Sequence, residues 1–262
     1  MSKAIILITL VAVLTSTILL PGCTTNGLGG IVTEEKDLTD FTYVAVEGTF
    51  DIEIVQSESF SVSVSADESF YDYVAVSKTG NTLRIYLNPR HTFTDFTLQA
   101  RTLKAKITMP ALHGVHLSGA SKGTVTGFKS SEDFSLEVSG ASSLNIDDSE
   151  VGDAEFKISG ASKVTGSMNA DDVKFEVSGA SKVDLDGSAS NFFLTASGAS
   201  KVDLTDFPLN NANAKLSGAS EASINVKGRL DAVVSAASSI YFLGNPTMGN
   251  ISVTGASTIK HK

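Results

Sequence analysis

The pentapeptide Gly119-Ala120-Ser121-Lys122-Gly123 has the glycine, serine and glycine spacing of a nucleophile elbow. In that motif the serine lies on a sharp turn from a strand into a helix, and a histidine and an acid activate its hydroxyl. Here the flanking residues favour strand on both sides, and Gly-Ala-Ser recurs along the chain, mostly without the second glycine. A repeated structural corner therefore explains the motif better than a hydrolase site does.

His113 and His116 are the nearest candidates for a metal pair or for the histidine of a catalytic triad. No further ligand stands at metal-site spacing from them, and proximity along the chain does not make a triad. We therefore expect no bound metal and no cofactor.

Three acidic pairs are the remaining candidates for catalysis: Asp147-Asp148, Asp171-Asp172 and Asp184-x-Asp186-Gly187. Paired carboxylates could hold calcium, or act as the acid and base of a β-helix polysaccharide lyase or hydrolase. The pairs stand in different phases of the repeat described next, so they are not expected to converge. Asp, Asn, Gly and Ser are also typical of turns. We prefer the interpretation as turns, with a carbohydrate-active enzyme as the alternative.

The elements that position these residues are set by a repeated Ser-Gly-Ala-Ser tetrapeptide. Six copies are intact and two further copies are degenerate, and their central positions are 18 to 21 residues apart. Those positions are Gly119, Gly140, Gly160, Gly179, Gly198, Gly218, Ala236 and Gly255. A period of this length is typical of a solenoid, in which each repeat buries its apolar side only by stacking on its neighbours.

Apolar residues stand at even offsets from each central glycine, and polar residues stand between them. Around Gly179, for example, Phe175, Val177, Val183 and Leu185 follow this rule. A period of two indicates strands, and no helical period of 3.6 is present. The parity is unchanged through the tetrapeptide, so the motif is expected to be a tight corner that keeps one side inward. The sequence thus predicts an all-β fold, a right-handed parallel β-helix with rungs of about 19–20 residues.

Two columns at odd offsets from the central glycine are expected to point outward. One carries lysine in four copies, and the other places aspartate beside two of those lysines. The residues are Lys122, Lys163, Lys182, Lys201, Asp184 and Asp203. Lysines stacked about 4.8 Å apart repel one another by roughly a kcal/mol or less in water. The columns are either a solvated face whose charges oppose aggregation, or a flat binding strip for a glycan or other extended polymer.

The N-terminus predicts export. Lys3 precedes an uncharged apolar run from Ala4 to Leu20, which is short for a membrane span and suits a signal peptide. Leu20-Pro21-Gly22-Cys23 resembles the lipobox of bacterial lipoproteins, in which the cysteine is acylated and becomes the first mature residue. Cys23 is the only cysteine, and a free thiol would be a liability in an oxidising envelope, so acylation is preferred to an ordinary secretory signal.

We divide the chain into a signal peptide (1–22), a flexible tether (23–40), a β-rich N-terminal part (41–112) and the repeat β-helix (113–262). The third part is expected either to cap the solenoid or to form its first coils, because an unpaired terminal rung would aggregate. Removing Lys3 with the signal peptide takes the formal charge from −9 to −10. That acidic balance argues against binding to nucleic acid.

The N-terminal part contains Val44-x-Val46-x-Gly48-x-Phe50-Asp51-Ile52, which precedes the iterated tetrapeptide. On these two features the chain resembles the head GIN domain family of auto-transporter adhesins, from about Phe41 to Lys262. The resemblance implies a secreted or lipid-anchored bacterial β-solenoid, and it supplies no catalytic residues.

We therefore expect a non-catalytic module of the cell envelope that binds, adheres or acts as a scaffold, anchored in the membrane by a lipid. A glycan or another envelope polymer is the expected partner, and nucleic acid is not. Thr24-Thr25 after the cysteine lacks the aspartate that often retains lipoproteins at the inner membrane, which favours the outer membrane. The sequence leaves open whether the protein faces the periplasm or the outside.

Overall fold

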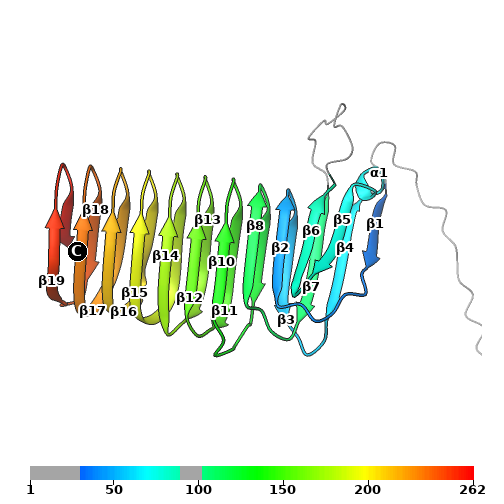
Figure 1. The fold of residues 1–262 in the computed structure, drawn as a ribbon, viewed down its shortest axis with the longest axis horizontal. Helices are drawn as coiled ribbons and strands as arrows, with labels where there is room; N and C mark the ends of the chain where they lie inside the picture. The colour runs from blue at the N-terminus through cyan, green and yellow to red at the C-terminus, as the bar shows by residue number, and fades with distance from the viewer. Residues whose placement is uncertain (1–29, 89–101) are drawn as a thin grey trace, which may run out of the picture.

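The computed structural model describes residues 30–88 and 102–262, which coil into a β-solenoid of about seven turns. Figure 1 shows the chain advancing along the long axis of the molecule, one turn beside the next. The predicted all-β parallel β-helix is confirmed. One short helix, α1 (Glu68–Tyr71), is found in the described residues, and it is neither long nor apolar enough to cross a membrane. The predicted signal peptide and Cys23 lie outside the described residues.

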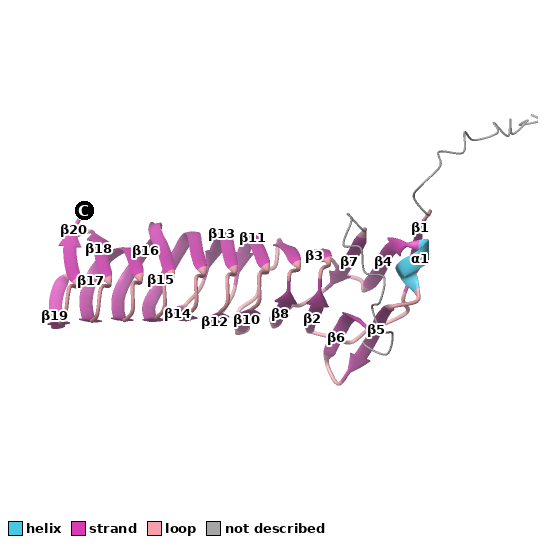
Figure 2. Cartoon of the chain, turned by 90° about the horizontal axis from the view of Figure 1, so that it is seen from above, coloured by secondary structure: helices cyan, strands magenta, loops and turns pink. Residues whose placement is uncertain are grey.

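Each turn, called a rung here, contributes strand segments to two opposite faces, seen as two rows in Figure 2. Face 1 stacks, in spatial order, β5 (Val74–Thr79), β6 (Thr82–Leu87), β2 (Tyr43–Gly48), β8 (Gly114–Gly119), β10 (Phe134–Val138), β12 (Ala154–Ile158), β14 (Asp172–Val177), the second halves of β15 (Lys182–Ala196), β16 (Lys201–Leu216) and β17 (Glu221–Val234), and β19 (Thr247–Val253).

Face 2 is built in the same way. It stacks β1 (Ile31–Glu35), β4 (Ser61–Asp67), β7 (Leu103–Met109), β3 (Asp51–Gln56), β9 (Lys122–Thr126), β11 (Ser143–Glu150), β13 (Lys163–Asn169), the first halves of β15, β16 and β17, β18 (Ser239–Leu243) and β20 (Thr258–His261). From β2 and β3 onward the pairing along both faces is parallel. Equivalent residues of successive repeats therefore stack in register, about 4.8 Å apart.

The Ser-Gly-Ala-Ser corner is closed by two hydrogen bonds that explain its sequence. In the fourth copy, around Gly179, the Ala180 amide donates to the Gly160 carbonyl of the rung before it, at 2.7 Å. The hydroxyl of Ser181 turns inward and donates to the Ser178 carbonyl at 2.9 Å. The last serine of every intact copy is buried, and none of these hydroxyls lacks a partner. The second serine is thus a buried turn-closing group.

The residues at even offsets from the central glycine form the core, as the period of two predicts. On face 1, Phe156 and Phe175 occupy equivalent positions of adjacent rungs, and their rings stack at 4.8 Å between centroids. Phe134 and Phe192 extend this aromatic column at its two ends. All four side chains are buried, so the column joins four rungs through one apolar contact surface.

The N-terminal part combines a rung with a cover. Strands β2 and β3 pair in parallel register with β8 and β9, so residues 43–56 form one rung of the solenoid. On its outer side, β6 and β7 pair in parallel with β2 and β3. Beyond them, β5 pairs antiparallel with β6, and β4 pairs antiparallel with β7. Antiparallel strands at this end interrupt the repetitive stacking, which blunts an aggregation-prone edge.

One stretch of the predicted tether is ordered, so that prediction is wrong for Ile31–Glu35. These residues form β1, which pairs antiparallel with β4 along its full length. Thr33 and Ser65 share a hydrogen bond between their hydroxyls at 2.7 Å, and the Lys36 amide donates to the Val62 carbonyl at 2.8 Å. The open edge of β4 supplies the order, because it offers unpaired backbone groups to a segment with little apolar pattern of its own.

Candidate binding face

The serine of the elbow-like motif cannot act as a nucleophile in this geometry. Ser121 is fully buried, and its hydroxyl donates to the carbonyls of Ser118 and Gly48 at 3.2 and 3.1 Å. The motif joins β8 to β9, which are two strands, whereas an elbow joins a strand to a helix. Ser121 is one more copy of the turn-closing serine.

His113 and His116 contact different residues. His116 projects from β8, and its Nδ1 lies 3.1 Å from a carboxylate oxygen of Glu137 in the next rung. His113 precedes β8, and its ring lies edge-on to the ring of Tyr43 at 6.2 Å. Among residues 30–88 and 102–262, no group of three or more His, Cys, Asp or Glu side chains is placed to hold a metal ion.

The acidic pairs do not converge. Asp148 forms an ion pair with Lys129 on the face 2 side, and Asp184 forms one with Lys182 on face 2. Asp172 lies at the start of β14 on face 1. These carboxylates therefore belong to separate parts of the surface, which agrees with their different phases in the repeat.

The lysines and aspartates of the outward columns stack on face 2. Lys163, Lys182 and Lys201 are register neighbours, and Asp184 lies beside Asp203 in the next column. The remaining lysine, Lys122, is separated from this group by Ser143 of β11 and has Asp51 of β3 on its other side.

Part of this strip is neutralised by its own neighbours. Lys182 binds Asp184 at 2.8 Å, and Lys201 binds Glu221 at 2.7 Å. The hydrogen bond to Glu221 raises the pKa of Lys201. Each pair is largely exposed, so each contributes about 0–1 kcal/mol to stability. The charge of the strip is therefore lower than the four lysines suggest.

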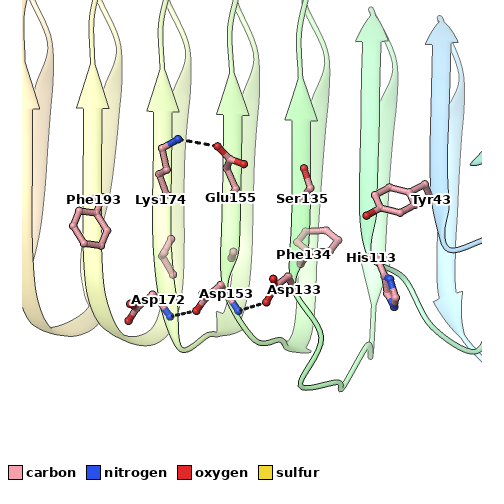
Figure 3. A pocket seen from close by; sticks show the side chains of 12 residues that line it. Tyr43, His113, Asp133, Phe134, Ser135, Asp153, Glu155, Asp172, Lys174 and Phe193 are labelled. Carbon is pink, nitrogen blue, oxygen red and sulfur yellow. Dashed lines mark hydrogen bonds and ion pairs between the residues drawn. The ribbon is translucent and has the colours of Figure 1, made fainter.

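A hollow on face 1 is the better-formed site. It is an open cavity of about 480 Å³ that spans six stacked strands, from β2 to β15. Figure 3 shows its outline, with Tyr43 at one end and Phe193 at the other. The side chains around it are Tyr43, His113, Asp133, Phe134, Ser135, Asp153, Ala154, Glu155, Asp172, Val173, Lys174 and Phe193.

One outward column of face 1 forms the length of the hollow. Tyr43 is the register neighbour of Gly114, and Ser135, Glu155, Lys174 and Phe193 follow in successive rungs. Five rung spacings separate the two aromatic residues, about 24 Å. Gly114 has no side chain, and the Tyr43 ring lies over it. Ser135, next in the column, has only a small side chain.

A ladder of carboxylates forms one long side of the hollow (Figure 3). An Oδ1 of Asp133 accepts from the Asp153 amide, and an Oδ1 of Asp153 accepts from the Asp172 amide, each at 3.2 Å. Asp172 in turn accepts from the side-chain and backbone nitrogens of Asn191, at 2.7 and 3.2 Å. These bonds hold each carboxylate in a fixed direction and leave its second oxygen available to a ligand.

An ion-pair network forms the opposite side. Lys174 binds Glu155 and Glu176, each at 2.8 Å, and Lys157 lies 3.5 Å from Glu155. The hydrogen bond from Lys174 lowers the pKa of Glu155, and Glu155 and Glu176 together raise the pKa of Lys174. A general acid for glycoside cleavage needs a raised carboxyl pKa, so Glu155 is suited to accept hydrogen bonds and not to donate a proton in catalysis.

Beyond this network lies a second open hollow of about 510 Å³, bounded in part by Glu137, Glu176 and Thr195. Face 1 thus carries two shallow depressions on either side of a charged ridge. The arrangement offers fixed donors, acceptors and aromatic surface over several rungs, which suits binding of an extended molecule.

The sequence-based reasoning missed this hollow, although part of its signal is present. The position seven residues before the central glycine is Asp133, Asp153, Asp172, Asn191 and Asn211 in successive repeats. An alignment of the repeats extended that far would have identified the ladder. The column of Tyr43 and Phe193 has no such signal, because a different residue type occupies it in every rung.

Several solved structures share the fold over nearly their whole length. A "putative adhesin" from Parabacteroides merdae is 18% identical with a TM-score of 0.79, and the match covers 90% of this chain and 98% of that chain. A "Putative lipid binding protein" from Parabacteroides distasonis is 17% identical with a TM-score of 0.75, over 89% and 97% of the two chains. A "putative adhesin" from Bacteroides fragilis is 19% identical with a TM-score of 0.68, over 89% and 97%.

At these identities the likeness establishes the fold alone. No curated protein sequence matches the chain. The model of one protein family, however, matches residues 40–246, which include the N-terminal rung and most of the repeats. The chain therefore belongs to the family described as "Putative auto-transporter adhesin, head GIN domain".

Proposed function

We propose that this protein is a non-catalytic binding module of the bacterial cell envelope, anchored to the outer membrane through Cys23, and that it holds an extended envelope polymer against face 1. The observation that carries the proposal is the hollow between Tyr43 and Phe193, whose charged side chains are paired or hydrogen-bonded. Groups held in this way supply a fixed binding surface. A general acid for glycoside cleavage needs a carboxyl group with a raised pKa, whereas the hydrogen bond from Lys174 lowers the pKa of Glu155.

The descriptions of the relatives support an adhesive or binding role at the envelope. One relative is described as lipid binding, which suggests acyl chains as an alternative ligand. The hollow of face 1 favours a polar polymer, because carboxylates, a lysine and a serine form most of its length. An acyl chain laid there would exclude water from these charged groups and would offer no hydrogen bond to the second oxygens of the ladder carboxylates.

The anchor is tested by Cys23→Ser. If Cys23 is acylated, the variant should remain unprocessed or lose its lipid, because serine offers no thiol for the thioether. In a detergent phase separation of whole cells, the parent should enter the detergent phase, and the mature variant should stay in the aqueous phase. Unchanged partitioning together with a mature N-terminus at another residue would refute the lipoprotein proposal.

Binding without turnover is tested by incubating the full chain with neutral and anionic envelope polysaccharides. We expect retention of intact polymer and no new chain ends after long incubation. Steady release of short products would make the protein an enzyme.

The face 2 strip is proposed as a second surface, which binds anionic polymers. The triple variant K163Q/K182Q/K201Q should weaken only anionic binding and flatten its salt dependence, with a nearly unchanged melting temperature. If the triple variant binds anionic polymers as well as the parent does, the strip is only a solvated surface.

A further inference from the structure

Phe193 is an aromatic residue on the outer surface of the solenoid. It projects outward from β15 with 48% of its surface exposed. Of the large apolar side chains that are exposed in the described residues, three belong to the terminal strand β19 and Phe193 is the one aromatic. Its two neighbours in the column, Lys174 and Asn213, are both polar. An exposed aromatic at the rim of a cavity is typical of a ligand contact.

Tyr43 is held as a matching surface at the other end. A side chain at Gly114 would meet the Tyr43 ring at 2.8 Å, so the ring lies closely over the backbone of β8. His113 supports the same ring from its edge. The ring therefore has a fixed orientation before any ligand arrives, and a fixed aromatic costs little entropy on binding.

The space between the rings is bounded mainly by groups that form hydrogen bonds. Ser135 lies in the column between them, with the carboxylates of Asp133, Asp153 and Asp172 along one side and Glu155 with Lys174 along the other. Sugars match this pattern, because a pyranose ring has apolar C–H faces that lie against aromatic rings and a rim of hydroxyls that donate and accept.

Charge selects the kind of sugar polymer. Four carboxylates face one lysine around the hollow, so its formal charge is −3 with His113 neutral. A negatively charged hollow repels polymers of uronic acids, phosphates or sulfates and does not repel a neutral polymer. The backbone groups of the face 1 strands pair with the strands on either side, so the hollow offers a peptide no free strand edge for pairing.

We propose that the face 1 hollow binds a neutral glycan chain, laid along the solenoid axis, with terminal sugar rings on Tyr43 and Phe193 and hydroxyls bound by the carboxylate ladder. This site rests on the proposed binding function and gives it a location and a ligand class. The backbones of Tyr43 and Phe193 are about 24 Å apart, and the Tyr43 ring lies over Gly114 one rung nearer to Phe193. The length that remains between the two rings fits a chain of several sugar rings.

The test uses the full chain and calorimetric titration with linear gluco-, manno- and xylo-oligosaccharides, with polygalacturonate and an unstructured polypeptide as competing classes. Phe193→Ala should weaken binding of a neutral oligosaccharide about tenfold or more, because it removes one aromatic contact surface. Ser135→Gln should also weaken binding of the oligosaccharide, because the longer side chain occupies the floor of the hollow. Val233→Ala is the matched control, since Val233 is 46% exposed on the same face but lies outside the hollow. It should leave the affinity within about twofold.

The outcomes separate the two proposals. Neutral-glycan binding that survives both Phe193→Ala and Ser135→Gln would overturn the hollow as the site and leave the binding function intact. Polygalacturonate or polypeptide binding that Phe193→Ala weakens would overturn the ligand class. If no polymer of any class binds the parent, the proposed function fails together with the site.

Discussion

Gly179→Val should destabilise the protein by about 2–4 kcal/mol, because the corner has neither the backbone freedom nor the space for a branched side chain. Gly179 has a φ of 74°, in the left-handed region that valine rarely adopts. A Cβ at this position would also collide with the Gly160 carbonyl oxygen, which accepts the Ala180 amide. The variant must therefore break a hydrogen bond between rungs as well as accept backbone strain. Urea unfolding should show the loss, with a less cooperative transition.

Gly255→Val is the matched control at the last copy of the corner. Its φ is 71°, and a Cβ there would approach the Ala236 carbonyl oxygen at 2.7 Å, with a rung on one side only. The cost should be smaller, since fewer contacts are disturbed. Ala236 itself has a φ of 63°, so one methyl group is tolerated in one rung. If both variants unfold at the urea concentration of the parent, stacking of these glycines does not stabilise the solenoid.

The fold could be predicted from the sequence because one period governs backbone and side chains together. Parity identifies the inward residues, and the recurring tetrapeptide identifies the corner, so Val164, Val183 and Val202 are correctly expected to stack in the core. The buried Ser181 follows the same parity, and its bond to the Ser178 carbonyl explains why the motif ends in serine. Repetition makes such local rules consistent over the whole solenoid.

Non-repetitive features were not predictable in this way. Strand β1 is ordered by pairing with the edge of β4, and no periodicity in Ile31–Glu35 predicts this pairing. Tyr43 reaches the hollow although it is 150 residues from Phe193 in the sequence, because β2 stacks on β8 across the intervening strands. The strands between β3 and β8 in the sequence decide which strand stacks on β2, and the sequence pattern does not show this. Binding surfaces made from unlike side chains of stacked rungs need the register as well as the repeat.

Phe175→Ala should cost about 3–5 kcal/mol, since it opens a cavity in the aromatic column at the centre of the solenoid. Phe175 is fully buried, stacks on Phe156 at 4.8 Å and meets Phe192 edge-on at 5.2 Å. The loss should appear in urea unfolding as a lower midpoint. Phe193→Ala removes the same side chain one rung further on, but from the outer surface, and should change the free energy of unfolding by about 0.5 kcal/mol or less.

This pair of phenylalanines separates stability from recognition. Phe175 and Phe193 lie on the same face in adjacent rungs, one directed inward and the other outward. If Phe193→Ala destabilised the protein as much as Phe175→Ala does, Phe193 would be a structural residue and the glycan surface would lose one of its ends. A stable Phe193→Ala variant with weakened glycan binding would mean that the exposed ring serves the ligand, because the solenoid folds equally well without it.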